Sequence, residues 1–254
     1  MKNKTKAKKV IRFIILTIFV LFMIAAVYFF QFTESGYTIS IPYRPGFQEI
    51  EPNVYMNKDN SMTQEEVRAV TAQAKERVTA FFGERHCTNQ TIIISDNDKI
   101  IKKIGEKDTN TYLFPHPKSY ICLSNEYFNV DVVAHELTHT ELHSYLSMDT
   151  YNKIPTWFDE GLATQNDYRE RYSYEKWVEK TDNGKNATPL QDMDSPDEFY
   201  CSNDDECQFH YICAKHEIGE WLERHSVQEL LKIVEAVNND EDFYTLYEKT
   251  GSPE

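Results

Sequence analysis

The chain has 254 residues, with 27 Lys and Arg against 41 Asp and Glu, and its formal net charge is −14. Residues 1–12 carry six cations and no acid, so residues 13–254 hold 21 cations against 41 acids, a net charge of −20. A surface this acidic repels phosphate backbones, which argues against a nucleic-acid partner. The length suits one sizeable domain or two small ones.

An uncharged apolar run, FIILTIFVLFMIAAVYFF, occupies residues 13–30 directly after the basic start. As a helix it spans about 27 Å, close to the hydrocarbon thickness of a bilayer. The run ends on bulky residues, and Ala25-Ala26 is a weak cleavage site. We therefore expect an uncleaved transmembrane anchor over residues 13–32, with a removed signal peptide as the alternative. The preceding cations predict a cytosolic tail over 1–12 and an extracytoplasmic remainder, periplasmic or extracellular.

Five cysteines follow this run, and an oxidising compartment permits them to form disulfide bonds. Cys201 and Cys207 bracket a five-residue loop, Cys87 and Cys122 are a second possible pair, and Cys213 is then left over. The sequence does not fix this connectivity. No C-x-x-C pair is present, which argues against a cysteine-rich zinc site.

Residues 33–60 are rich in Pro, Gly, Asn and Tyr and predict a linker with short extended pieces. A helix is expected over residues 61–82, because Thr63 and Glu66 form a capping box and Gly83 follows as a stop. The β-branched run QTIIIS, 90–95, predicts a buried strand. TYLFP and SYICLS, around 111–124, predict two further strands joined through Pro115 and Pro117.

The second half of the chain is expected to be mostly helical. Helices are predicted over about 129–146 and from about Pro155, whose ring suits a first helical turn. Residues 181–206 predict a long surface loop, and residues 207–250 predict further helices. The expected fold class is therefore α+β, with a small mixed sheet followed by helices in one domain over 61–254.

The segment VVAHELTHTELH, 132–143, has the spacing of a metal site. His135 and His139 are four residues apart, so both rings lie on one helix face, and Glu136 can point at a water on a shared ion. Zinc suits two imidazoles and a carboxylate with one position open. The alternative is a solvated polar face, which the apolar neighbours of these residues argue against. His143 lies about 12 Å from His135 along a regular helix, so it is expected near the site or partly exposed.

The next helix offers a third ligand within IPTWFDEGLA, residues 154–163. Together with HELTH, this segment resembles the gluzincin metallopeptidases, in which a W-x-x-E-G-x-A segment follows H-E-x-x-H. The resemblance implies a zincin-like fold, zinc held by His135, His139 and Glu160, and Glu136 as general base on the zinc-bound water. The apolar residues flanking Glu160 agree, since a buried carboxylate needs a cation. Asp159 is the alternative ligand, or else a helix cap or a partner for a histidine N–H.

The similarity to small peptidase-MA-like domains covers about residues 90–250. It places Tyr211 where related enzymes stabilise the oxyanion, with His210 and His216 as rivals and a core tyrosine as the simpler interpretation. The chain lacks the G-x-M-E-N segment of the aminopeptidase branch, so trimming of amino termini is not supported. Its 20 residues between the motifs, 140–159, also exceed the usual spacing of that branch.

The resulting hypothesis is a membrane-anchored zinc endopeptidase that acts on a peptide or protein substrate. SYICLS is expected to be an edge strand that pairs with an extended peptide. One alternative is a membrane-tethered zinc-containing module that binds a peptide without turnover. Another is a metal-free interaction domain in which HELTH arose by chance.

Overall fold

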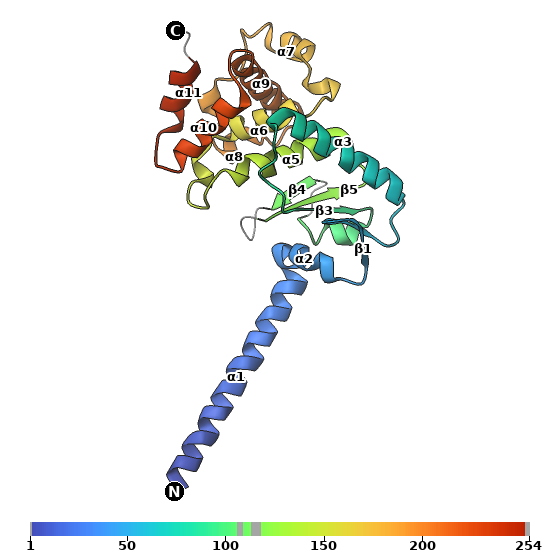
Figure 1. Ribbon diagram of the computed structural model, residues 1–254, viewed down its shortest axis with the longest axis vertical. Helices are drawn as coiled ribbons and strands as arrows, with labels where there is room; N and C mark the ends of the chain where they lie inside the picture. Colours follow the sequence, from blue (N-terminus) through green and yellow to red (C-terminus); the bar gives the residue numbers. More distant parts are fainter. Residues whose placement is uncertain (1, 106–108, 113–117, 252–254) are drawn as a thin grey trace.

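The computed structural model describes residues 2–105, 109–112 and 118–251 (Figure 1). Within this part of the chain the fold is mixed α+β, as expected, with one five-stranded sheet followed by helices. The strands are β1 (Phe47–Glu51), β2 (Val54–Asn57), β3 (Gln90–Ser95), β4 (Thr109–Tyr112) and β5 (Ser119–Ser124). The helices are α1 (Lys2–Phe32), α2 (Glu34–Ser40), α3 (Gln64–Phe82), α4 (Asp98–Ile101), α5 (Val130–Ser144), α6 (Thr156–Gln165), α7 (Tyr174–Thr181), α8 (Pro196–Phe199), α9 (Asp204–Leu222), α10 (Val227–Val237) and α11 (Phe243–Gly251).

The sheet is mixed, with the order β1-β2-β3-β5-β4. Strands β2, β3 and β5 are parallel, whereas β1 and β4 run antiparallel to their neighbours. The SYICLS segment is β5, which lies between β3 and β4, so its prediction as an edge strand was wrong. The edge strand on this side of the sheet is the shorter β4, which pairs with β5 from Thr109 to Tyr112. The predicted link through Pro115 and Pro117 lies outside the described residues.

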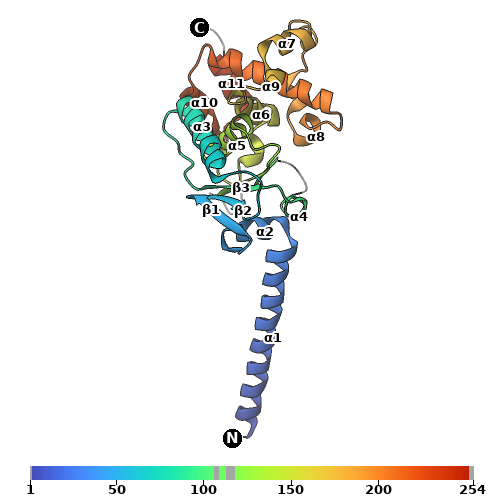
Figure 2. The same cartoon turned by 90° about the vertical axis from the view of Figure 1, so that its right-hand side faces the viewer.

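The two faces of the sheet are covered by different helices, which explains the unbroken apolar run of β3. Ile92 and Ile94 face the large core under α3 and α5, while Ile93 faces a smaller core that includes Tyr37 and Ile41. Figures 1 and 2 show α3 and α5 on one side of the sheet and α2 on the other. A strand that is buried on both faces does not alternate between apolar and polar residues, which is why isoleucines follow one another in β3.

Residues 33–60 are part of the folded domain, so their prediction as a linker was wrong, but the short extended pieces expected there are present as β1 and β2. The segment contributes β1 and β2 to the sheet and α2 to the smaller core. Tyr37, Ile41 and Phe47 are buried there. The strands have only five and four residues, joined by a turn at Asn53 with φ of 65°. Turn-forming residues therefore dominate the composition of a segment that is nevertheless packed.

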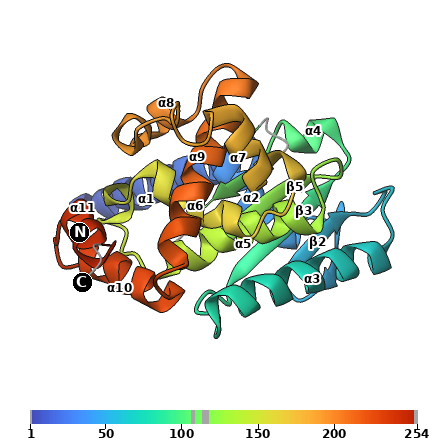
Figure 3. The ribbon, with the colours of Figure 1, turned by 90° about the horizontal axis from the view of Figure 1, so that it is seen from above.

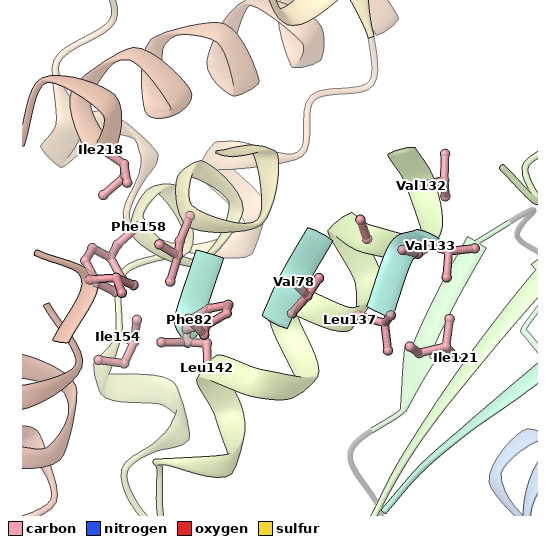
Figure 4. Close-up of a cluster of buried hydrophobic side chains, with 14 of the residues drawn as sticks. Val78, Phe82, Ile121, Val132, Val133, Leu137, Leu142, Ile154, Phe158 and Ile218 are labelled. Atoms are coloured by element: carbon pink, nitrogen blue, oxygen red, sulfur yellow. The ribbon is translucent and has the colours of Figure 1, made fainter. Parts of the chain in front are cut away.

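The large core runs from the sheet through α3 and α5 into the C-terminal helices. Figure 4 shows Ile121 of β5 and Leu137 of α5 at one end, and Phe158 of α6 and Ile218 of α9 at the other. Figure 3 shows α9 alongside α6, and these two helices are in close contact. Because one core connects the sheet to the helices, α5 and α6 are held in a fixed relation.

Helix α3 begins as its capping box predicts. The Thr63 hydroxyl accepts from the Glu66 backbone N–H at 3.2 Å, and the Glu66 carboxylate accepts from the Thr63 N–H at 2.7 Å. The helix ends at Gly83, whose φ of 82° favours glycine. The expected start and stop of this helix are therefore confirmed.

Helix α1 extends away from the rest of the molecule, so that the N-terminus lies far from the C-terminus (Figure 1). Residues 9–32 are long and apolar enough to cross a membrane, with a mean hydropathy of 2.9, and none of that span is buried. A membrane anchor and a signal sequence both have these properties. The apolar helix predicted over 13–32 is thus present.

The surface loop predicted over 181–206 is more ordered than its composition indicates. It contains α8 and a 3₁₀ turn at Leu190–Met193, and Met193 and Phe199 are buried in the core. All five cysteines are free in the structure, so neither proposed disulfide is present. The Cys201 sulfur instead lies 3.4 Å from His210 Nδ1, and the Cys87 sulfur lies against Gln90 at 3.7 Å.

Candidate metal centre

The centre starts on helix α5, which carries two histidines one turn apart. Asn129 caps this helix, its side chain accepting from the N–H groups of Asp131 and Val132 at 3.1 Å. His135 and His139 share a face of the helix, and their Nε2 atoms lie 3.1 Å apart. The two side chains are only 10% and 11% exposed. Two nearly buried ring nitrogens therefore point at the same place.

Helix α6 supplies a carboxylate to that place. It begins at Thr156, with Pro155 as the preceding cap residue, one position later than expected. Glu160 Oε2 lies 3.3 Å from His135 Nε2 and 3.5 Å from His139 Nε2. The structure thus brings the three predicted ligand side chains together, while their role as metal ligands stays a prediction.

These three atoms fit a zinc ion in two respects. Ligands about 2.0–2.1 Å from a tetrahedral ion lie about 3.3 Å from one another, close to the observed 3.1, 3.3 and 3.5 Å. Among the described residues, the buried Glu160 Oε2 has no hydrogen-bond partner. A buried carboxylate oxygen without a donor is costly unless a cation faces it.

Asp159 holds two histidine rings at once. Its Oδ1 accepts from His139 Nδ1 at 2.6 Å, and its Oδ2 accepts from His143 Nε2 at 2.5 Å. The bond to Asp159 uses Nδ1 of His139, which leaves Nε2 as the nitrogen that faces the centre. Asp159 therefore contacts the ring of a predicted ligand, which was one of the roles predicted for it. His143 lies near the site, as expected, but it is buried rather than exposed.

Two carboxylates of the centre are held in their ionised form by the histidines beside them. Burial raises the pKa of Asp159, but His143 and His139 outweigh it and hold the Asp159 pKa well below its usual value. Burial likewise opposes ionisation of Glu160, yet the same kind of histidine contacts lower its pKa. Burial lowers the pKa of His139, and the carboxylates of Asp159 and Glu160 raise it well above normal. Two ionised carboxylates thus attract positive charge to the histidine nitrogens.

Tyr200 is a site residue that the sequence did not reveal. Its hydroxyl donates to Glu160 Oε1, so the second oxygen of the carboxylate is satisfied while Oε2 faces the histidines. Tyr200 follows α8 and stands 40 residues after Glu160, inside the segment expected to be a surface loop. The consecutive aromatic residues Phe199 and Tyr200 were the available signal for a packed segment, because the buried Phe199 holds its neighbour in place.

Glu136 lies beside the three convergent atoms and is held by the edge strand. The Thr111 hydroxyl of β4 donates to Glu136 Oε2 at 2.5 Å. Both residues line a cavity of about 350 Å³ that also contains His135, His139 and Glu160. The sequence did not indicate Thr111, because β4 has only four residues and its pairing depends on the sheet.

Of the three candidates for oxyanion stabilisation, the structure brings Tyr211 to the cavity. Tyr211 lines it, and its ring centroid lies 6.2 Å from that of His135. His210 is directed elsewhere, with Nδ1 donating to the Phe199 carbonyl at 2.9 Å. His216 packs against Trp177, with 3.5 Å between ring centroids, in a separate cavity.

A scan of protein-family profiles found no match to the chain, and a search of curated proteins also found none. The gluzincin resemblance therefore rests on the HELTH and WFDEGLA residues themselves.

Proposed function

We propose that the protein is a membrane-tethered, zinc-dependent peptidase of the gluzincin type, with a zincin-like fold. One observation carries the proposal. His135 Nε2, His139 Nε2 and Glu160 Oε2 lie within 3.1–3.5 Å of one another, beside a cavity that Glu136 also lines. Two imidazoles and a carboxylate with an open side are a donor set typical of catalytic zinc.

His135, His139 and Glu160 would hold the zinc ion, which would supply a Lewis acid that polarises the scissile carbonyl and lowers the pKa of the attacking water. Glu136 accepts a proton from that water and passes it to the leaving amine. The hydrogen bond from Thr111 to Glu136 Oε2 fixes the orientation of the carboxylate for this transfer. Asp159 keeps His139 in the tautomer that a ligand needs.

Tyr211 is the proposed donor to the oxyanion of the tetrahedral intermediate. Burial raises its pKa well above normal, so the hydroxyl keeps its proton and can donate. Tyr200 is already committed to Glu160, whereas the Tyr211 hydroxyl has no hydrogen bond within the part of the chain that the structure describes. Tyr211 is therefore available to a substrate in the cavity.

The apolar part of α1 is proposed to anchor the protein in a membrane. The six cations within residues 1–12 favour a cytosolic N-terminus, which puts the peptidase domain on the extracytoplasmic side. The proposed substrate is accordingly a peptide or protein on that side of the membrane.

The proposal is tested by comparing cleavage products of wild type and Glu136→Gln in a proteomic digest. We expect the variant to keep its metal and to lose hydrolysis by at least about 100-fold, because it cannot accept the proton. Glu126→Gln, on an exposed turn before α5, is the matched control and should cleave as wild type does.

Equal cleavage by Glu136→Gln would overturn the assignment of the base. Bound zinc with no wild-type cleavage of any peptide would instead support the alternative, a tethered zinc-containing module that binds peptides.

A further inference from the structure

A second, smaller cavity adjoins the metal centre and is lined by cations. It measures about 140 Å³ and shares His135, Glu136 and Tyr211 with the centre, and Arg169 and Arg171 also line it. Both arginines belong to the stretch after α6 that contains a 3₁₀ turn at Glu170–Tyr172. The cavity is thus a continuation of the proposed active site, and its charge differs from that of the chain as a whole.

Arg169 is the fixed member of the pair. Its Nε lies 2.9 and 3.0 Å from the two carboxylate oxygens of Asp167, and its Nη2 also donates to that carboxylate. The Asp167 side chain is fully buried, so this ion pair anchors the wall of the cavity. The charge of Arg169 is largely offset by this partner.

Arg171 is the member whose charge is available. It is exposed, and no carboxylate pairs with it among the residues that the structure describes. Its guanidinium lies over the ring of Tyr172, 4.6 Å from the centroid. Its backbone carbonyl accepts from Gln208 of α9 at 2.9 Å, which holds the turn in place. Arg171 therefore carries a guanidinium with no ion-pair partner among the described residues, and it lines a cavity that Glu136 also lines.

We propose that this small cavity binds a carboxylate of the substrate next to the bond that is cut, with Arg171 as its principal partner. The inference rests on the proposed peptidase function. A guanidinium presents a planar fork of N–H donors that matches a carboxylate, and such charge-assisted bonds are about twice as strong as neutral ones. The carboxylate belongs either to an Asp or Glu side chain or to the C-terminus of a peptide.

The net charge of −20 over residues 13–254 does not oppose this preference at short range. Exposed charges more than about 8 Å apart are largely screened at physiological ionic strength. The acidic surface thus slows the approach of an acidic peptide, whereas the contact with Arg171 determines the stability of the bound complex. Local and global charge act on different steps of binding.

The first test measures kcat/KM of the full-length protein in detergent with peptides blocked at both ends. The peptides carry Asp, Asn or Lys at each position on either side of the cut. At one position we expect Asp to exceed Asn about tenfold, and Arg171→Gln to reduce this ratio to about one. Arg171→Lys should keep part of the ratio. The matched control Arg224→Gln, on an exposed site at the end of α9, should keep all of it.

A second set of peptides with free C-termini identifies the source of the carboxylate. A preference seen only in this set assigns the cavity to a terminal carboxylate, and a preference in the blocked set assigns it to a side chain. The absence of an acid preference in both sets would overturn the inference, as would an unchanged preference in Arg171→Gln.

Binding provides a readout that does not need turnover. Fluorescence anisotropy with labelled acidic and amide peptides on the Glu136→Gln protein should show the same tenfold preference, lost on adding Arg171→Gln. Cleavage that needs Glu136 but ignores acids would refute this inference alone. Absence of cleavage would refute the proposed function, while the anisotropy ratio would still decide whether the carboxylate site exists.

Discussion

At the scale of single residues, Asp159 makes the most consequential contact outside the three proposed ligands. Both of its oxygens are used by histidines, His139 at 2.6 Å and His143 at 2.5 Å. The carboxylate fixes the ring that faces the centre and adds negative charge beside it. Partners of this kind raise the affinity of a histidine for a metal.

We expect Asp159→Asn to weaken zinc binding about 10- to 100-fold, because the amide cannot supply the charge and can favour the wrong tautomer of His139. Competition with a chromophoric chelator measures this affinity. The control is Asp149→Asn on an exposed loop, which should bind zinc as wild type does. Unchanged affinity in Asp159→Asn would show that His139 does not depend on this contact.

The residues predicted from the sequence are those on regular helices. His135, Glu136 and His139 follow from helical periodicity, and Glu160 follows from the resemblance of WFDEGLA to the gluzincin segment. Thr111 and Tyr200 were missed because they reach the centre from the sheet edge and from the segment after α8. Contacts 25 and 40 residues apart in the chain depend on tertiary packing, which no local pattern encodes.

At the scale of elements, the close approach of α6 and α9 positions Glu160. A Cβ atom at Gly161 would lie 2.5 Å from the Ala214 carbonyl oxygen and 2.9 Å from its carbon, so only glycine fits. The residue directly after the proposed ligand is therefore the point where the two helices touch. Glycine at this position of the motif thus has a packing role.

Gly161→Ala should lower the free energy of unfolding by about 2 kcal/mol, because the clash is with backbone and outweighs the better helix propensity of alanine. Urea denaturation followed by circular dichroism measures the loss. Gly219→Ala on α9 is the matched control, since its nearest neighbour would be Gln165 Oε1 at 3.7 Å. That variant should gain up to about 1 kcal/mol. Equal stability of the two variants would contradict the packing role of Gly161.

Long elements were easier to predict than short ones. The start and end of α3 and the run of β3 carry local signals, namely a capping box, a terminal glycine and consecutive isoleucines. Strands β1, β2 and β4 have five residues or fewer, and turn residues surround them. The linker prediction failed because β1 and β2 become strands only by pairing with their neighbours, and the edge-strand prediction failed because β4 pairs with the outer side of β5.

At the scale of the whole molecule, α1 adds no residue to either hydrophobic core. None of the apolar span of α1 is buried, and the smaller core begins at Tyr37. The contacts that cross this boundary include those from Arg44 to the Phe30 carbonyl and, at 3.3 Å, to Gln31 Oε1. We therefore expect the stability of the domain to depend little on α1.

Removal of residues 2–32 should release the protein from membranes without changing its thermal midpoint by more than about 2 °C, because no core residue is lost. Fractionation and circular dichroism measure the two effects against the full-length chain. A truncated protein that stays in the membrane fraction, or that unfolds, would contradict the separation of anchor and domain.

The central claim is that His135, His139 and Glu160 hold one zinc ion. The most direct measurement is the metal content of the full-length protein, purified without a histidine tag, by inductively coupled plasma mass spectrometry. We expect about one zinc per chain in wild type and in Glu136→Gln, and almost none in the His135→Ala, His139→Ala double variant. Wild-type protein without stoichiometric zinc, or a double variant that keeps it, would contradict the account.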